Sequence, residues 1–448
     1  MPKKKTALTI EERLQQTLVP AEEQPYEVPE NWVWVRLKSV ASWGSGGTPS
    51  RKHEEYYNGD ILWIKTGELN NGWIYDTEEK ITDEGLKKSS AKLFPPYSVL
   101  IAMYGATIGK VAILGVPATT NQACACAVCN KSLLYMYLFY YCISQKNVFI
   151  EKGKGGAQPN ISQIILKQHP IPLPPLFEQQ RIVERIEELF AKLDEAKERL
   201  QEVADSFAVR KAAILHKAFT GELIGKQVTE LVSLENLVDL IKIGPFGSSL
   251  HESDYIENGI PLVNPKHIVQ QRIVPQSKIS ISDEKAEELS SYKLKENDIV
   301  LGRRGEMGRC APISNREENW ICGTGSMIIR LKKEYDAKLY SLILGSQATV
   351  TYLENSAVGS TLKNLNEKIV RKIPVPQFSS EEQHEIVRLV DDLLARERKA
   401  QQATEQALAS IDLMKKSILA RAFRGELGTN KASEASALEL LKQVLAEN

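Results

Sequence analysis

Three closely spaced cysteines, Cys124, Cys126 and Cys129, are the residues with the most obvious chemical potential. Thiolates at such short spacing can hold zinc or an iron–sulfur cluster. Cysteines two residues apart on a strand, however, point to the same face, where small apolar side chains pack. The matching segment in the second half of the chain, Gly325 to Leu331, contains no cysteine. We therefore predict buried free thiols that bind no metal, and a zinc or iron–sulfur site is the alternative.

Two glycine- and proline-rich motifs resemble parts of nucleotide and methyl-transfer sites. Gly105 to Lys110 (GATIGK) is one residue shorter than a phosphate-binding loop, and Val111 stands where a magnesium-binding hydroxyl is required. Phe94 to Tyr97 (FPPY) resembles the motif that holds the target amine in amino-methyltransferases, but a phenylalanine accepts no hydrogen bond. We interpret the first motif as a tight turn that carries a cation and the second as a turn before a strand.

Acidic residues near a lysine could form a nuclease site. Asp60, Lys65 and Glu68 lie close together in the sequence, but such triplets are common in a chain with this many charges. The six histidines have no serine, cysteine or carboxylate partner at a recognisable spacing. The sequence therefore predicts no catalytic residue, and it predicts that the chain is not itself an enzyme.

Polar and basic residues on turns form the remaining candidate site. Backbone phosphates are bound by Lys, Arg and hydroxyl groups, and base edges are read by Arg, Asn or Gln on turns that enter a groove, so we predict a DNA interface. In the first half it comprises Ser45, Thr48, Ser50, Arg51, Lys52, Lys65, Asn70, Asn71, Ser89, Ser90, Tyr104, Thr107 and Lys110. In the second half it comprises Lys242, Ser248, Ser249, His251, Lys266, His267, Gln270, Arg303, Arg304, Arg309 and Lys363.

An internal repeat supplies the elements that must position these residues. At a constant offset of 204 residues, Glu178-Gln179 matches Glu382-Gln383, and Ala218 to Leu223 (AFTGEL) matches Ala422 to Leu427 (AFRGEL). Some sixty residues align in this way without a gap, which indicates a duplication. Each copy predicts a long helix that begins near the Glu-Gln pair and ends at Gly221 or Gly425.

Apolar residues step along both helices by alternating fours and threes, the spacing of a coiled-coil seam. The predicted seam comprises Ile182, Ile186, Leu189, Leu193, Leu200, Phe207, Ile386, Val390, Leu393 and Ile411, with Ala196 and Val203 in the first copy. The second copy places Glu397 and Thr404 on the seam, which predicts looser packing there. Matching registers favour mutual pairing of the two helices over the alternative of two helices that pack on separate cores.

Short strands punctuated by Gly, Asn and Asp precede each helix and predict irregular β-rich domains. We expect an N-terminal extension at 1–30, a globular domain at 31–156, a repeated region with a long helix at 157–225, a second globular domain at 226–359, a second repeated region at 360–428 and a tail at 429–448. The sequences of the two globular domains differ far more than those of the helices. This difference predicts a shared frame that carries two domains with different tasks.

Composition limits the function classes. The chain has 448 residues, of which 42% are hydrophobic, and it contains 57 Lys and Arg against 57 Asp and Glu, so overall charge neither indicates nor excludes a nucleic-acid partner. The longest apolar run, Leu133 to Ile143, is about half of what a bilayer crossing requires. The start of the chain is polar, and the six cysteines fit a reducing compartment. We therefore expect a soluble, cytoplasmic protein.

The whole layout, from about Trp32 to Leu427, resembles the specificity subunits of Type I restriction-modification systems. The sequence segments that carry this resemblance are Gly59 to Gly72 (GDILWIKTGELNNG), Gly85 to Ile113 (GLKKSSAKLFPPYSVLIAMYGATIGKVAI) and Thr120 to Cys124 (TNQAC). The resemblance implies an α+β fold with two β-rich target-recognition domains, separated by two long antiparallel coiled-coil helices in a pseudo-two-fold internal repeat. It also implies sequence-specific binding of double-stranded DNA at a bipartite target, as part of phage defence.

The same resemblance implies partners. Two modification subunits would bind S-adenosylmethionine and methylate adenine, and two restriction subunits would use ATP and Mg, so no cofactor is expected in this chain. The alternative is a paired DNA-recognition module that serves a different methyltransferase or phage-defence complex. Neighbouring genes for a methyltransferase with an Asn-Pro-Pro-Tyr-type motif and for a helicase-nuclease would distinguish the two.

Overall fold

The computed structural model describes residues 9–153, 160–246, 249–357 and 364–447. It divides into two compact units, one formed by residues 1–199 with 408–448 and the other by residues 200–407. We refer to these as unit 1 and unit 2. Both divisions fall inside long helices, so each unit contains one globular domain and a part of each helix.

Two long helices, α7 (Leu176–Thr220) and α12 (Ser380–Ala422), contain 45 and 43 residues. Gly221 and Gly425 follow them with φ of 78° and 75°, a left-handed conformation that glycine adopts without steric cost. The helix starts and stops thus agree with the sequence prediction to within a few residues.

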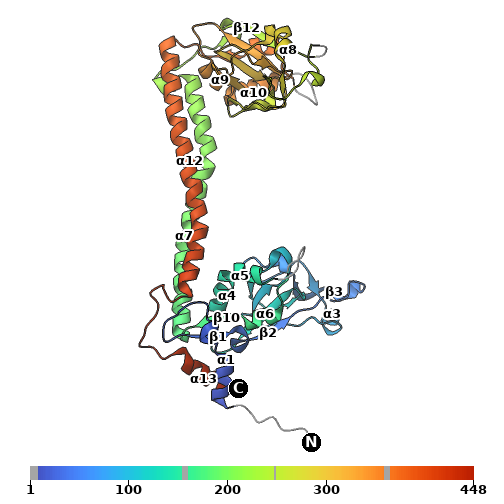
Figure 1. Cartoon of the computed structure of the whole chain (residues 1–448), viewed down its shortest axis with the longest axis vertical. Coiled ribbons are helices and arrows are strands. Elements are labelled where there is room, and N and C mark those ends of the chain that lie inside the picture. The colour runs from blue at the N-terminus through green and yellow to red at the C-terminus, as the bar shows by residue number, and fades with distance from the viewer. Residues whose placement is uncertain (1–8, 154–159, 247–248, 358–363, 448) are drawn as a thin grey trace. The chain divides into compact units, whose positions relative to one another are not determined.

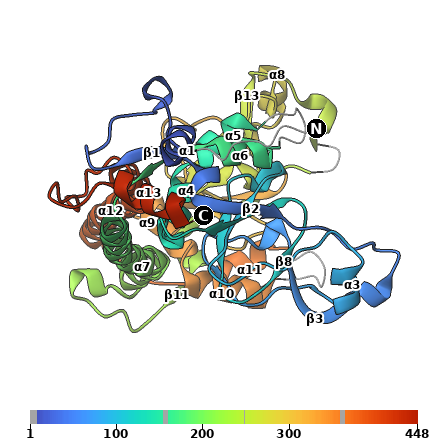
Figure 2. The ribbon, with the colours of Figure 1, turned by 90° about the horizontal axis from the view of Figure 1, so that it is seen from below.

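The two helices run antiparallel beside each other within each unit (Figures 1 and 2). In unit 1, Lys415 Nζ of α12 lies 2.5 Å from Asp194 Oδ1 of α7, and the Lys197 and Asp412 side chains lie 3.7 Å apart. In unit 2, Arg210 Nε lies 2.9 Å from Glu397 Oε2. In these ion pairs, the residue number on α12 decreases as the residue number on α7 increases, so the helices are antiparallel.

The seam positions differ in burial along the helices. Ile182 and Ile186 are fully buried in the core of unit 1, and Ile386 and Val390 are fully buried in that of unit 2. Phe207 and Ile411 are also buried, whereas Leu189, Leu193, Leu200 and Leu393 are half-buried. The expected seam position of Val203 is wrong, because its side chain is 42% exposed, whereas neighbouring Ala204 is half-buried. A straight helix with 3.6 residues per turn drifts out of a strict heptad in this way.

The globular domain of unit 1 contains two sheets and a strand pair. The larger sheet has the order β2 (Ala41–Ser45), β9 (Cys124–Cys129), β6 (Val99–Ala102), β7 (Val111–Leu114) and β4 (Trp73–Ile74). The smaller has the order β5 (Lys80–Ile81), β3 (Tyr57–Ile64) and β8 (Thr119–Thr120), and β1 (Val33–Arg36) pairs with β10 (Pro170–Leu173). The helices of unit 1 are α1 (Ile10–Thr17), α2 (Leu37–Val40), α3 (Asp83–Lys87), α4 (Tyr135–Ser144), α5 (Lys146–Lys152), α6 (Gln163–Gln168) and α13 (Ala437–Glu447).

The domain of unit 2 has the same core topology. The larger sheet has the order β12 (Val238–Ile243), β20 (Ser326–Leu331), β17 (Asp298–Gly302) and β18 (Cys310–Pro312). The smaller sheet has the order β16 (Ser280–Ile281), β13 (Ile260–Val263) and β19 (Ile321–Cys322). β11 (Val232–Ser233) pairs with β21 (Pro374–Val375), and β14 (Ile268–Val269) with β15 (Arg272–Ile273). The helices are α8 (Asp283–Glu288), α9 (Ala337–Leu344), α10 (Gln347–Ser356) and α11 (Glu367–Arg371). The central strand of each smaller sheet, β3 or β13, pairs antiparallel with one neighbour and parallel with the other.

The repeated Glu-Gln motif fixes each long helix to its own domain. Gln179 is fully buried, and its amide accepts a bond from Leu134 N at 2.8 Å and donates to the carbonyls of Ser132 and Pro174. Gln383 makes the same three bonds, with Asp336 N and the carbonyls of Glu334 and Phe378. The motif therefore joins the start of α7 to α4, and the start of α12 to α9.

The segments before β1 and after α12 pack together in unit 1, with α1 beside α13 (Figure 1). Arg13 Nη1 donates to the carbonyl of Leu445 at 2.9 Å, and the Arg181 guanidinium of α7 makes two bonds to the Glu434 carboxylate, at 2.8 and 2.9 Å. The roles that the sequence left open for the extension and the tail are therefore structural in part. Within the described residues, every helix is too short or too polar to cross a lipid bilayer.

Candidate nucleic-acid interface

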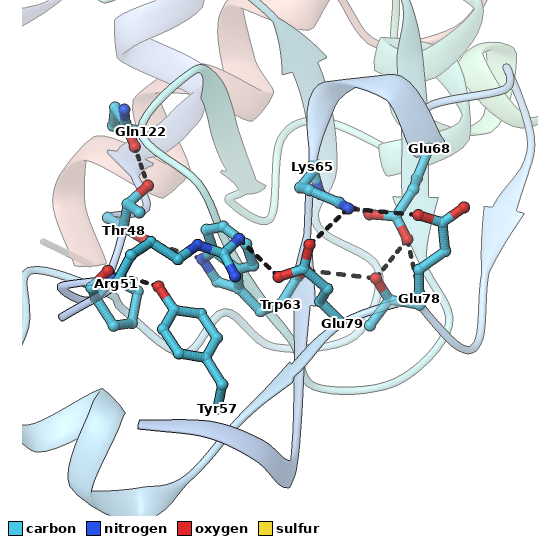
Figure 3. Close-up of polar contacts among 12 residues, drawn as sticks. Thr48, Arg51, Tyr57, Trp63, Lys65, Glu68, Glu78, Glu79 and Gln122 are labelled. Atoms are coloured by element: carbon cyan, nitrogen blue, oxygen red, sulfur yellow. Dashed lines mark hydrogen bonds and ion pairs between the residues drawn. The ribbon is translucent and has the colours of Figure 1, made fainter. Parts of the chain in front are cut away.

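A loop after β2 presents Arg51 above two aromatic rings (Figure 3). The guanidinium carbon lies 4.3 Å from the centre of the Tyr57 ring and 5.3 Å from that of Trp63. Its Nη2 donates to Glu79 Oε2 at 2.7 Å, and 57% of the side chain remains exposed. The aromatic faces and the carboxylate together hold a cation at the protein surface in one orientation.

Lys65 reaches the same carboxylate from the end of β3 (Figure 3). Its Nζ lies 2.9 Å from Glu79 Oε1 and 3.3 Å from Glu78 Oε2, and these contacts, chiefly with Glu79, raise the pKa of Lys65. The hydrogen bond from Lys65, followed by that from Arg51, lowers the pKa of Glu79. Lys65 is therefore partly covered and paired, rather than a free cation on a turn.

Glu68 builds the turn that follows β3, so the acidic triplet of the sequence forms no common site. One carboxylate oxygen accepts from Lys65 N at 2.7 Å, and the other accepts from the Thr77 hydroxyl at 2.5 Å and from Glu78 N at 3.0 Å. Asp60 is exposed on β3, and its own side chain takes no part in these bonds. Glu68 therefore has a structural role, because its carboxylate binds backbone nitrogens of this turn.

The other first-half candidates form two groups around these turns. In the first group, the Thr48 hydroxyl donates to the Gln122 side chain, and Ser89 Oγ accepts from Ala91 N. Ser90 packs against the same loop, because a β-carbon added to Gly47 would lie only 2.2 Å from Ser90 Oγ. The second group surrounds the β6–β7 turn, where Thr107 donates to the Tyr104 carbonyl and Asn71 exchanges bonds with Val111. Exposed members are Thr48, Ser50, Lys52, Asn70, Asn71, Ser90 and Tyr104, and half-buried members are Ser45, Ser89, Thr107 and Lys110.

In unit 2 the candidate cations differ in how far the protein itself binds them. Arg309 Nη1 donates to the Pro265 carbonyl at 3.3 Å, and its other nitrogens bind Glu306. Arg303 Nε donates to the Leu365 carbonyl at 3.0 Å, and burial, with the neighbouring Arg304, lowers the pKa of Arg303. Arg303 is therefore anchored inward, whereas Arg304 and Lys266 are exposed.

The remaining second-half candidates lie further along the same domain. Lys242 Nζ lies 4.3 Å from the centre of the Tyr292 ring, and Gln270 is exposed at the β14–β15 turn with φ of 48°. Ser249 and His251 are exposed. Ser248 and Lys363 lie outside the described residues.

His267 does not face the surface as the sequence prediction requires. Its side chain is buried, and Nδ1 lies 2.8 Å from the Leu262 carbonyl and 3.2 Å from Asn264 N. It occupies the place in its turn that Glu68 occupies in the first domain, where both residues bind the backbone nitrogen three positions earlier. Burial, the largest influence, lowers the pKa of His267, so the neutral ring is the stable form. This residue is part of the core rather than a DNA contact.

The four cysteines of unit 1 lie in two separate apolar clusters. Cys124 and Cys126 pack in one cluster beside Phe94, whereas Cys129 packs in the main core of unit 1 with Cys142. Burial raises the pKa of Cys126 and that of Cys129 to about 12. Neither thiol is therefore poised to become the thiolate that a metal ion binds. No group of side chains suited to a metal ion occurs among the described residues, and metal-free thiols remain a prediction.

Tyr57, Trp63 and Glu79 are site residues that the sequence reasoning missed. The first two are aromatic residues of one strand, which is typical of core positions, and Glu79 lies in a charged run. A signal was present in the tyrosine and tryptophan at positions i and i+6, because even spacing places side chains on one face of a strand.

Comparisons with known proteins match both halves of the chain to one family. The model of the Type I restriction modification DNA specificity domain matches residues 29–205 and again residues 232–407. The chain belongs to this family.

Similar members of the specificity-domain family come from distant organisms. The MjaIX specificity subunit of Methanocaldococcus jannaschii is 29% identical over 62% of this chain and 68% of its own length. The EcoKI specificity subunit of Escherichia coli K12 is 25% identical over 94% of this chain and 96% of its own length. The crystal structure of the HsdS subunit from Thermoanaerobacter tengcongensis has a TM-score of 0.62 at 21% identity and covers 90% of this chain and 99% of its own, which supports the fold.

Proposed function

We propose that this chain is the DNA-reading specificity subunit of a Type I restriction-modification enzyme, and that each globular domain reads one half of a bipartite target. The observation that carries the proposal is a pair of domains with one topology and different surface side chains. At the equivalent turns after β6 and β17, the first domain carries exposed Tyr104 and the second exposed Arg304, and after β3 and β13 the first carries Lys65 where the second carries Asn264. Different donors on one frame are what two different half-sites require.

The chain itself performs no catalysis in this proposal. Its candidate chemical groups serve other ends, because Glu68 binds backbone nitrogens and Cys126 is buried with a raised pKa. Methyl transfer, with S-adenosylmethionine, and ATP- and Mg-dependent restriction would belong to two modification and two restriction subunits. The names of the relatives, which are subunits of Type I restriction enzymes, support this division. A protein that reads host and phage DNA would act in the cytoplasm.

Exchange of the second domain tests the proposal. Residues 231–359 are replaced by the matching segment of a relative, and methylated sites are sequenced in cells that also express the modification subunit. One half of the methylated sequence should change while the other half stays the same. Changes in both halves would contradict it, and so would a wild-type chain that directs no sequence-specific methylation. A complex with a methyltransferase but no ATP-dependent subunit would favour a different defence system.

A further inference from the structure

The loop that carries Arg51 is mounted rigidly on the first domain. Gly47 N donates to the Thr120 carbonyl at 2.9 Å, and Trp63 Nε1 donates to the Gly47 carbonyl at 2.9 Å. The Tyr57 hydroxyl donates to the Pro49 carbonyl at 2.5 Å. A β-carbon added to neighbouring Gly46 would lie 1.8 Å from the Thr120 oxygen, so the backbone is packed too closely for a side chain there. The base of the Arg51 side chain is therefore fixed.

The head of Arg51 is oriented as well but keeps unused donors. Glu79 is its one acceptor among the described residues, and that contact occupies Nη2. A guanidinium has five N–H donors arranged in a plane, so further donors on the exposed part of the group are available to a ligand. A planar, preoriented fork with free donors matches two acceptors that lie side by side.

The ligand of Arg51 could be a DNA phosphate or the edge of a base, and the charges around Arg51 distinguish between these two. The side chain borders a pocket of about 320 Å³ that is also lined by Glu54, Tyr57, Asn58, Glu78, Glu79 and Lys80. The nearby lysines add no unbalanced positive charge, because Lys65 pairs with Glu79 and Lys80 pairs with Asp76. A phosphate is attracted by excess positive charge, which these carboxylates remove. A base edge is read by donors in fixed geometry, which the carboxylates provide.

We propose that Arg51 reads a guanine in the half-site of the first domain by donating two hydrogen bonds to its O6 and N7 atoms. Glu79 acts as a positioning residue that fixes the guanidinium plane, and Lys65 holds Glu79 in turn. The inference rests on the proposed function, because it requires that the first domain lies on DNA. Arg–guanine pairs of this kind discriminate against the wrong base by about 5- to 150-fold.

The test uses the full chain with its modification subunit, in cells whose methylated sites are sequenced. Domain exchange first assigns each half of the wild-type target. Arg51→Ala and Arg51→Lys should then both accept other base pairs at one G·C position in the first half only, because a lysine lacks the planar fork. Glu79→Gln, which keeps the shape but loses the charge, should relax the same position to a smaller extent. Lys38→Ala, which removes an exposed lysine of α2 that does not line this pocket, is the control and should keep the original target.

Binding measurements on synthetic duplexes of the wild-type target supply the second readout. The preference for G·C over A·T at that position should fall from about 5- to 150-fold to nearly 1 in Arg51→Ala. A uniform loss of affinity for every sequence, with a shallower salt dependence, would instead identify a phosphate contact and overturn the proposal. A first half without any G·C pair would also overturn it. If the wild-type chain directs no specific methylation, the proposed function itself fails.

Discussion

Replacing Gln179 with alanine should destabilise unit 1 by about 3 kcal/mol without affecting unit 2. The amide makes three buried hydrogen bonds, at 2.8, 2.9 and 3.0 Å, and its removal leaves one backbone N–H and two carbonyls without these partners. Each lost bond costs about 1 kcal/mol, and the three together give the expected sum. Gln383→Ala should destabilise unit 2 by a similar amount, because Gln383 makes the equivalent three bonds.

Hydrogen exchange measured by mass spectrometry separates the two units. In Gln179→Ala, amides of α4 that exchange through opening of unit 1 should exchange up to about 150-fold faster, while α9 stays at the wild-type rate. Gln383→Ala should give the reverse pattern. Gln180→Ala is the control, since Gln180 is exposed and bonds only to Glu184 among the described residues. Loss of less than 1 kcal/mol in Gln179→Ala, or equal acceleration in both units, would refute the structural role of the Glu-Gln motif.

Three further predictions address acid stability, DNA contact and metal content. Burial, followed by the charge of Lys152, lowers the pKa of His169 to about 3 against an ordinary value of 6.5, so the neutral ring stabilises unit 1 above pH 6.5. That stability should fall by about 1.4 kcal/mol per pH unit as pH drops from 6.5 toward 3, and urea unfolding of His169→Gln at pH 7 and 5 should lack this loss. Arg304→Ala should lower the slope of log affinity against log salt by about 1 if the exposed arginine meets a phosphate, and an unchanged slope would exclude that contact. Elemental analysis of the purified chain should find no stoichiometric zinc or iron, and a metal that is lost in Cys126→Ala would show the thiol prediction to be wrong.

Periodicity predicted the long helices because each carries its own signal. The duplicated Glu-Gln pair and the following apolar steps locate α7 and α12, and Gly221 and Gly425 locate their ends. Local pattern does not report where a helix with 3.6 residues per turn drifts out of a strict heptad. Val203 is exposed, although its spacing fits the heptad.

The candidate site was harder to predict because residue type does not report direction. Arg51 and Lys65 were found as cations on turns, but their shared partner Glu79 lies 28 and 14 residues away along the chain. His267 looked like another polar turn residue, yet the third position of its turn points inward and binds the backbone. Alignment of the two turns would have indicated this, because Glu68 and His267 occupy the same position.

The two copies of the frame hold the segment beside each helix start with different ion pairs. In unit 2, Glu382 at the start of α12 pairs with Lys226 in the segment after α7, at 2.8 Å. In unit 1, the equivalent Glu178 is buried and accepts bonds from Trp32 and Asn430, which stands in the place of Lys226.

The cation of unit 1 comes instead from the helix itself, because Arg181 of α7 binds Glu434 in the segment after α12. An arginine at the start of a helix favours an acidic segment, and a carboxylate at the same position disfavours it. Docking of the 434 segment on the start of α12 would bring Glu434 toward Glu385, the equivalent of Arg181. Like charges disfavour this arrangement. The pair of Arg181 with Glu434 therefore favours docking of the segment after α12 on the start of α7, although the two helix sequences are nearly the same.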